Sequence, residues 1–341
     1  MMSHAMIEIN ELTLDYEFGG RLMRALDQVS FKLERGEVLG VAGESGCGKS
    51  TLGLSIIRLL PKIAKIKGGG ILFKGRDLLK LSEEQMNREI RGKEISMIFQ
   101  NPQSALNPVF KVETQMTDVL LYQSRYQNEG RRKTRNEIKK EAIAKLKETG
   151  IADPAERISN YPFEFSGGMK QRVMIAMALS SKTSLLIADE PTTALDVTIE
   201  AQILELIRDM HAKYKTSILY ISHDLGVLSE ISKRIMVMYA GRIFEMGQTE
   251  VVLQEPRHPY SAALLESLPG THTKRDRLLS LPDFVPSLDR LPSGCSFHTR
   301  CRFSKEICHQ KVPPLLEVST GHWSACFLEH QDKGKHKWKW F

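Results

Sequence analysis

The chain has 341 residues, enough for two or three domains of ordinary size. Its content of 41% hydrophobic and 26% charged residues is typical of a soluble globular protein. No uninterrupted apolar run approaches the roughly 20 residues that a membrane helix needs, and the N-terminus lacks the basic-then-apolar order of a signal peptide. We therefore expect the chain to stay in the cytoplasm.

The net charge of +7 is distributed unevenly. Residues 131–147 contain eight Lys or Arg and two Glu, and the tail 333–341 adds four Lys beside aromatic residues. Such runs could indicate nucleic acid or a membrane surface as a partner. Ile138, Ala142 and Leu146 recur every four residues in the first run, so an ordinary amphipathic helix is the favoured interpretation there. For the tail, a loose chain end is favoured.

The first part of the chain predicts antiparallel strands. Residues 6–36 alternate apolar and polar side chains around a turn at Gly19-Gly20. Further strands are predicted at 71–73, after three glycines, and at 95–99. Tyr16 lies at the end of the first strand, where an aromatic ring could stack on an adenine base, although such a ring more often belongs to the core.

Residues 43–51 form the most specific motif of the chain. The sequence Gly-Glu-Ser-Gly-Cys-Gly-Lys-Ser-Thr follows an apolar strand and precedes a helix predicted at 52–60, which Pro61 ends. Glycines let the backbone curl until successive N–H groups point at an anion, and a helix N-terminus favours negative charge. Lys49 can reach the β- and γ-phosphates of a nucleotide, and the Ser50 hydroxyl can bind Mg²⁺. The predicted phosphate-binding residues are Gly43, Ser45, Gly46, Cys47, Gly48, Lys49, Ser50 and Thr51.

A helical insertion is predicted from about 104 to 180, where helical periodicity replaces the strand pattern. Gln100 precedes this insertion, at the end of a predicted strand. A polar residue there could contact a ligand or lie in a hinge, or it could only cap the strand. Near its end, Ser166-Gly167-Gly168 opens an apolar helix to Leu179. These residues could bind an anion at the helix N-terminus, or Ser166 could only cap the helix.

Two further strands end in polar residues. The apolar strand 184–190 finishes on Asp189 and Glu190, at the carboxyl end where α/β proteins place ligand chemistry. Asp189 is placed to hold Mg²⁺ through water and Glu190 to orient and deprotonate a water molecule, with a helix N-cap as the alternative. The strand 217–222 ends at His223, which could contact a γ-phosphate or be an ordinary polar residue.

The C-terminal residues 256–341 are rich in Pro and weak in aliphatic periodicity, so we expect a loop-rich extension. Four of the five cysteines lie in it, and in a cytoplasmic protein such a cluster favours metal or redox chemistry over disulfides. No pair is Cys-x-x-Cys, and four thiolates could hold either Zn²⁺ or an iron–sulfur cluster. A metal could supply stability that the poor apolar core does not. The four are Cys295, Cys301, Cys308 and Cys326, with His298, His309 and His322 as nearby spare ligands.

Together these motifs resemble the ATP-binding subunits of ATP-binding-cassette transporters over about residues 7–270. The resemblance rests on six elements in the family's order: the phosphate loop, the Q-loop Gln100, the signature Ser166-Gly167-Gly168, the acidic pair Asp189-Glu190, the D-loop Leu195-Asp196 and the switch His223. Finer features resemble the oligopeptide and dipeptide importer branch, including Phe99-Gln100-Asn101-Pro102, Met169 in the signature, His258-Pro259-Tyr260 and the C-terminal cysteines.

This resemblance implies an α/β fold. It is an ABC-type P-loop NTPase core with an antiparallel β-subdomain and a helical insertion over residues 1–255, followed by the Cys-containing extension 256–341. It implies Mg²⁺-dependent ATP hydrolysis, with Tyr16, or alternatively Phe18, stacking on adenine. The catalytic residues implied are Lys49, Gln100, Glu190 and His223, the Mg²⁺ residues are Ser50, Gln100 and Asp189, and the four C-terminal cysteines hold a [4Fe–4S] cluster, with Zn²⁺ as the alternative.

The resemblance also implies an assembly. A second ATPase subunit, identical or related, would pair head to tail, so that Ser-Gly-Gly of one subunit covers the ATP held by the other. Two permeases and an extracytoplasmic solute-binding protein would complete an importer of dipeptides, oligopeptides or related solutes, with this chain peripheral on the cytoplasmic face of the membrane. The alternative is a soluble ABC ATPase acting on nucleic acid, but such proteins usually carry two cassettes and this chain has one phosphate loop.

Overall fold

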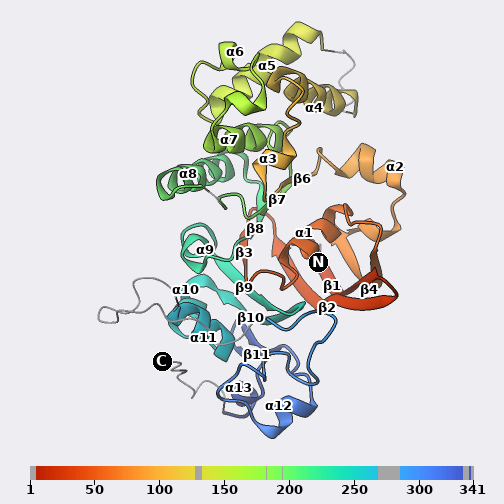
Figure 1. The fold of residues 1–341 in the computed structure, drawn as a ribbon, viewed down its shortest axis with the longest axis vertical. Helices are drawn as coiled ribbons and strands as arrows, with labels where there is room; N and C mark the ends of the chain where they lie inside the picture. The colour runs from red at the N-terminus through yellow and green to blue at the C-terminus, as the bar shows by residue number, and fades with distance from the viewer. Residues whose placement is uncertain are drawn as a thin grey trace. The chain divides into compact units, whose positions relative to one another are not determined.

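The structure is a computed structural model that describes residues 5–126, 133–181, 183–193, 195–267, 285–332 and 338. The chain forms two compact units, one of Met1–Leu79 with Tyr220–Phe341 and one of Lys80–Leu219. Figure 1 labels most of their helices and strands. Of the predicted basic and aromatic tail, only Trp338 lies within the described residues. In the described ranges we find no helix with both the length and the apolar character needed to cross a bilayer.

The first unit begins with a four-stranded antiparallel sheet in the order β2-β1-β4-β5, as predicted for residues 6–36. Its strands are β1 (Ala5–Phe18), β2 (Arg21–Glu34), β4 (Ala64–Phe73) and β5 (Arg76–Asp77). Strand β4 starts seven residues before the predicted strand because its glycines stay in the ladder: Gly70 pairs with Asn10 and Gly68 with Thr13, with a register shift between them. The glycines therefore mark a bulge and not the start of the strand.

A second set of strands in this unit runs in the order β3-β9-β10-β12-β11, with β3 parallel to β9 and the other pairs antiparallel. These are β3 (Val38–Ala42), β9 (Arg234–Tyr239), β10 (Arg242–Gln248), β11 (Leu316–Ser319) and β12 (His322–Ser324). Strands β9 and β10 form a hairpin, and β11 and β12 belong to the extension that the sequence indicated as loop-rich. The unit's helices are α1 (Lys49–Ile57), α9 (Leu225–Ile231), α10 (Thr249–Gln254), α11 (Pro259–Glu266), α12 (Glu306–Gln310) and α13 (Phe327–Asp332).

Helix α1 starts three residues before the predicted 52–60 and ends before Leu60. Gly48 is its N-cap residue, and Arg58 adopts a left-handed conformation at the other end. The Arg58 N–H donates to the carbonyls of Leu54 and Ser55, which closes the last turn. The helix thus stops before Pro61 can end it.

The second unit contains the predicted helical insertion. Its helices are α2 (Glu83–Gln85), α3 (Pro102–Ala105), α4 (Val112–Tyr126), α5 (Arg135–Glu148), α6 (Pro154–Arg157), α7 (Gly167–Ala178) and α8 (Val197–Tyr214), and its parallel strands are β6 (Ile95–Ile98) and β7 (Leu185–Asp189). The chain passes into the first unit within β8 (Ser217–Ile221). In α5, Ile138, Ala142 and Leu146 are fully buried, which confirms the amphipathic interpretation of the basic run.

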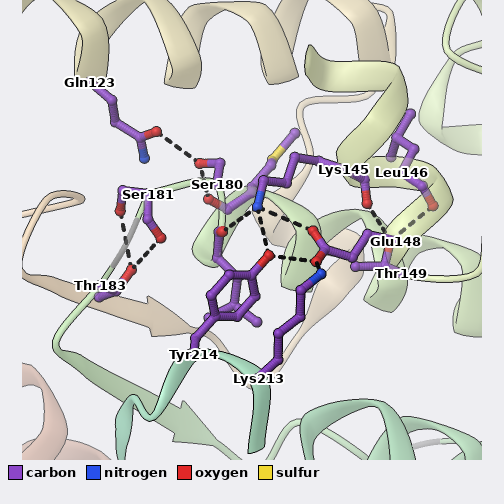
Figure 2. Close-up of polar contacts among 12 residues, drawn as sticks. Gln123, Lys145, Leu146, Glu148, Thr149, Ser180, Ser181, Thr183, Lys213 and Tyr214 are labelled. Atoms are coloured by element: carbon purple, nitrogen blue, oxygen red, sulfur yellow. Dashed lines mark hydrogen bonds and ion pairs between the residues drawn. The ribbon is translucent and has the colours of Figure 1, made fainter. Parts of the chain in front are cut away.

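A polar cluster around Glu148 ties α5 to α8 in this unit. Figure 2 shows the Lys145 ammonium directed at both the Glu148 carboxylate and the Tyr214 hydroxyl, with Nζ–O distances of 3.1 and 3.3 Å. Lys213 and Tyr214 also donate to the same carboxylate. Burial alone would raise the pKa of this carboxyl, but the hydrogen bonds from Lys213, Tyr214 and Lys145 lower it to about 2.

Glu148→Gln should lower the free energy of unfolding by about 1–2 kcal/mol at pH 7, because the charge-assisted hydrogen bonds need the ionised carboxylate. A carboxyl with a folded-state pKa below its unfolded value binds more protons when unfolded, so its stabilisation is complete above pH 4.5 and is lost as the pH falls toward 2. Denaturant unfolding at several pH values should therefore show that the difference in free energy of unfolding between the two proteins becomes smaller as the pH falls. Glu84→Gln, at an exposed pair, is the control and should change stability by less than about 0.5 kcal/mol. A pH-independent difference would contradict the assignment.

Candidate functional site

The predicted phosphate loop has the backbone that its glycines allow. Gly43, Gly46 and Gly48 have positive φ values of 148°, 81° and 105°. A Cβ on Gly43 would lie 2.3 Å from the Met238 carbonyl oxygen, and one on Gly48 would lie 2.7 Å from that of Ala25. Both close approaches are to backbone atoms, which cannot rotate away. The curl of the loop therefore requires glycine at these two positions.

Lys49, the first residue of α1, lies inside this curl. It is 4% exposed, and its ammonium donates to the carbonyl oxygens of Gly43 at 2.7 Å and Glu44 at 3.0 Å. The first turn of α1, which is fully described, has no acidic residue. A buried cation beside a helix N-terminus makes a local site for an anion such as phosphate.

Tyr16 lies next to the helix that follows the loop. Its hydroxyl is 3.0 Å from the Thr51 hydroxyl, and its ring is half-buried. Phe18, the alternative aromatic, is 69% exposed near the β1–β2 turn. The structure thus brings Tyr16 to the phosphate loop, and its stacking on a base stays a prediction.

His223 reaches the same part of the first unit from another strand. It follows β8, and the N–H of the preceding Ser222 donates to the Val41 carbonyl at 3.1 Å. Val41 lies in β3, which leads directly into the loop. Asp224 caps α9 by accepting from the Gly226 and Val227 N–H groups, so the neighbour of His223 is fixed in place.

In the second unit, the structure brings Gln100 and Glu190 together. The Gln100 amide donates to Glu190 Oε2 at 2.8 Å, and the Thr193 hydroxyl donates to the same oxygen at 2.9 Å. Glu190 follows Asp189, the buried last residue of β7, and has a φ of +45°. Such a conformation costs a non-glycine residue on the order of 1–3 kcal/mol, so the local structure holds this carboxylate against strain.

The Ser-Gly-Gly sequence opens α7, and Ser166 is its N-cap. The Ser166 Oγ accepts from the Met169 N–H at 3.3 Å, while Ser166 and Gly167 remain exposed. A Cβ on Gly168 would lie 2.7 Å from the Ile199 side chain of α8, whereas one on Gly167 would be 3.6 Å from Leu195. The cap that the sequence left as an alternative is thus observed, and Gly168 has a packing role.

The four C-terminal cysteines line one cavity in the first unit. The cavity is otherwise mainly apolar, with Phe297, Phe303 and Leu328 in its wall. Burial is the main factor that raises the pKa of Cys295 to about 11 and of Cys301 and Cys326 to about 12. Such thiols stay protonated at neutral pH unless a cation enters the cavity.

The histidines near the cysteines have other contacts. His322 is buried and lies 2.7 Å from the Glu245 carboxylate, and His298 Nδ1 lies 2.8 Å from the Cys295 carbonyl oxygen. Among the described His, Cys, Asp and Glu residues, no three gather closely enough to hold a single metal ion.

Glu44, Tyr260 and Arg300 also belong to the loop's surroundings, and the sequence assigned none of them a role at the nucleotide site. The Glu44 N–H donates to the Tyr260 hydroxyl at 3.0 Å, and the Arg300 guanidinium binds the Glu44 carboxylate. These partners are more than 200 residues from Glu44 in sequence, so no local spacing pattern reveals them. The available signals are the position of Glu44 inside the loop motif and that of Tyr260 in the feature His258-Pro259-Tyr260.

The family model described as ABC transporter matches residues 26–193, and that of the oligopeptide/dipeptide transporter C-terminal region matches residues 244–308. The chain is 47% identical to a probable peptide ABC transporter ATP-binding protein of Sinorhizobium fredii, over 96% of each chain. It is 43% identical to an oligopeptide transport ATP-binding protein of Bacillus subtilis, over 97% of this chain and 90% of that one.

A solved structure gives a similar result. An ATP-binding cassette solved as a dimer in a post-hydrolysis state, bound to ADP and phosphate, matches with a TM-score of 0.63 and 25% identity. The match covers 72% of this chain and 99% of that one.

The two neighbouring glycines of α7 should respond differently to alanine. Gly168→Ala should destabilise the protein by about 1–3 kcal/mol, because the new methyl group meets Ile199 at the α7–α8 contact. Gly167→Ala should be neutral or stabilise by up to about 1 kcal/mol, because its methyl group has ordinary contacts and alanine favours the helix. Denaturant unfolding measures the stability of both variants. Adding Ile199→Ala to the Gly168→Ala variant should recover part of the stability that Gly168→Ala loses. Equal effects at both positions would reject the close-contact explanation.

Proposed function

Because this chain belongs to the ATP-binding proteins of the ABC transporter family and is an ATPase that uses ATP and Mg²⁺, we propose that it energises the import of dipeptides or oligopeptides through partner permeases. The observation that carries the solute class is the match of residues 244–308 to the oligopeptide/dipeptide transporter C-terminal region. Relatives named for peptide, oligopeptide and dipeptide transport, at 39–47% identity along nearly the whole chain, support it.

In this proposal the first unit binds the nucleotide. The phosphates lie on the curl of residues 43–51, with the Lys49 ammonium neutralising charge on the β- and γ-phosphates and Tyr16 stacking on the adenine ring. The buried Lys49 and the Tyr16–Thr51 contact support these roles. His223, at the end of the strand beside β3, contacts the γ-phosphate.

The second unit supplies the hydrolytic groups. Glu190 accepts a proton from the attacking water, and its hydrogen bond from Gln100 orients the carboxylate. Hydroxyl, amide and carboxylate oxygens suit Mg²⁺, so Ser50, Gln100 and Asp189 are its proposed ligands, directly or through water. Mg²⁺ held by these residues would neutralise negative charge on the phosphates of the nucleotide.

A complete site needs a second ATPase subunit in this proposal. Ser166 and Gly167 are exposed at the start of α7, so they are available to cover a nucleotide held by another chain. The similar solved cassette is a dimer with ADP and phosphate. ATP thus holds two subunits together and hydrolysis releases them, which is a shift between two states driven by a ligand.

The remaining partners follow from the transport role. The helical insertion passes closure of the ATPase pair to two transmembrane permeases, an extracytoplasmic binding protein delivers the solute, and this chain lies at the cytoplasmic face of the membrane. The similar proteins are named for peptide transport, and no described feature favours the nucleic-acid alternative. We also propose that the nucleotide-binding domain ends near residue 255, where the C-terminal extension begins.

For the cysteines we propose a [4Fe–4S] cluster. All four line one mainly apolar cavity, as a cluster with four thiolate ligands requires. Four thiolates could also hold Zn²⁺, and the resemblance to the peptide-importer branch is what favours the cluster over zinc. When bound, it would cross-link the segments that carry the cysteines.

Glu190→Gln should retain ATP binding and lower turnover by roughly 10²- to 10⁴-fold, because glutamine keeps the shape but cannot accept the proton. The measurement is phosphate release by the complex assembled with its partner subunits, together with ATP binding. Glu205→Gln, at an exposed position on α8, is the matched control and should leave both unchanged. Undiminished hydrolysis in Glu190→Gln would reject the general-base role.

Anaerobically purified protein should show broad visible absorption and contain about four iron and about four sulfide per chain. Cys308→Ser should lose most of this iron, while Cys47→Ser should retain it because Cys47 is buried outside the cavity. A colourless protein with one bound zinc would reject the cluster in favour of Zn²⁺. Neither outcome depends on the ATPase assay.

A further inference from the structure

Arg300 of the C-terminal extension makes a buried, two-point contact with the phosphate loop. Its side chain is 2% exposed, and it donates from Nη1 to Glu44 Oε2 at 2.7 Å and from Nη2 to Oε1 at 3.1 Å. Nη1 also donates to the Tyr239 hydroxyl at 3.3 Å. Paired hydrogen bonds between a guanidinium and a carboxylate fix both distance and direction, so the Glu44 side chain is held in one orientation.

Tyr260 holds the backbone of the same loop residue. Its hydroxyl accepts from the Glu44 N–H at 3.0 Å, and the tyrosine is fully buried. Its ring lies 4.7 Å from that of Tyr239 and 5.3 Å from that of Phe297, centroid to centroid. Arg300 packs over the Tyr239 and Phe297 rings as well. One aromatic cluster therefore positions both groups that contact Glu44.

These contacts reach Lys49 through one residue. The Glu44 carbonyl accepts from Lys49 Nζ at 3.0 Å, while the Glu44 N–H and carboxylate are held by Tyr260 and Arg300. A shift of Glu44 would therefore move an acceptor of the phosphate-binding ammonium and the backbone where the curl begins. Binding is favoured when such groups are already in place, because no free energy is then used to order them.

We propose that Arg300 and Tyr260 are positioning residues for nucleotide binding: the C-terminal extension holds Glu44 so that the phosphate loop and Lys49 are arranged for phosphate. This rests on the proposed nucleotide site. The plain alternative is that the contacts only attach the extension to the rest of the first unit. The two differ in whether ATP affinity depends on them.

The test compares ATP binding by full-length Arg300→Met, Glu44→Gln and the double variant in the presence of Mg²⁺. Each single variant should raise the Kd for ATP about tenfold, equivalent to the loss of one charge-assisted contact. The double variant should be no weaker than the worse single variant, because both changes remove the same interaction. In the assembled complex the KM for ATP should rise while kcat changes little, since neither residue touches the reacting atoms.

Further variants separate positioning from folding. Tyr260→Phe removes one oxygen and keeps the ring, and should raise the Kd several-fold; Arg300→Lys should restore part of the affinity lost in Arg300→Met. Arg234→Met is the control, because Arg234 pairs with Glu37 at the opposite end of β3 from the loop and should leave the Kd unchanged. Should Arg300→Met not fold, Glu44→Gln and Tyr260→Phe carry the test.

Wild-type Kd values in Glu44→Gln and Tyr260→Phe would overturn the positioning role, as would additive effects in the double variant. Failure of the unchanged protein to bind ATP would instead overturn the proposed function itself. The two failures are therefore distinguishable from the same titrations.

Discussion

The curl of the phosphate loop is the constraint on which the first unit depends. It brings the backbone of Gly43 and Gly48 against the carbonyls of Met238 and Ala25, so tightly that a single methyl group would not fit. The Gly241 N–H donates to the Cys47 carbonyl at 2.9 Å, which fastens the β9–β10 turn to the same loop. Strands far apart in sequence are thus held by backbone contacts that no rotamer change can relieve. Substitution of these glycines would displace strands as well as the loop.

Features determined by neighbours in sequence were predictable. The Gly19-Gly20 turn, the β9–β10 hairpin and the buried stripe of α5 follow from chirality and periodicity over a few residues. Strands β11 and β12 could not be predicted in this way. They have four and three residues, too few for alternation, and they form because β10 offers an edge at Glu245 and Met246. Pairing with a distant edge leaves no local signal.

The candidate site also has parts that local sequence predicts and parts that it does not. Single residues of the site could be named from motifs, and the Gln100–Glu190 hydrogen bond joins two that were named separately. The sequence left Ser166 with two alternatives, capping the helix or binding an anion. The observed cap satisfies one backbone N–H, whereas a helix N-terminus has four N–H groups without a partner inside the helix. Capping and anion binding are therefore compatible there. The contact between Arg300 and Glu44 exists only in the folded chain, so no motif could predict it.

The extension is more firmly integrated than its composition suggests. Phe297 and Arg300 face the aromatic cluster and the loop, while Cys295 and Cys301, in the same seven-residue stretch, line the cysteine cavity. Short backbone hydrogen bonds within the stretch, from His298 to Cys295 and from Arg300 to Phe297, keep these side chains in fixed relation. Because Arg300 and Cys301 are consecutive, a displacement of one must move the other. The stretch 295–301 therefore contacts the phosphate loop and also lines the cysteine cavity. The arrangement of the loop depends on residues that lie more than 250 positions away in the sequence.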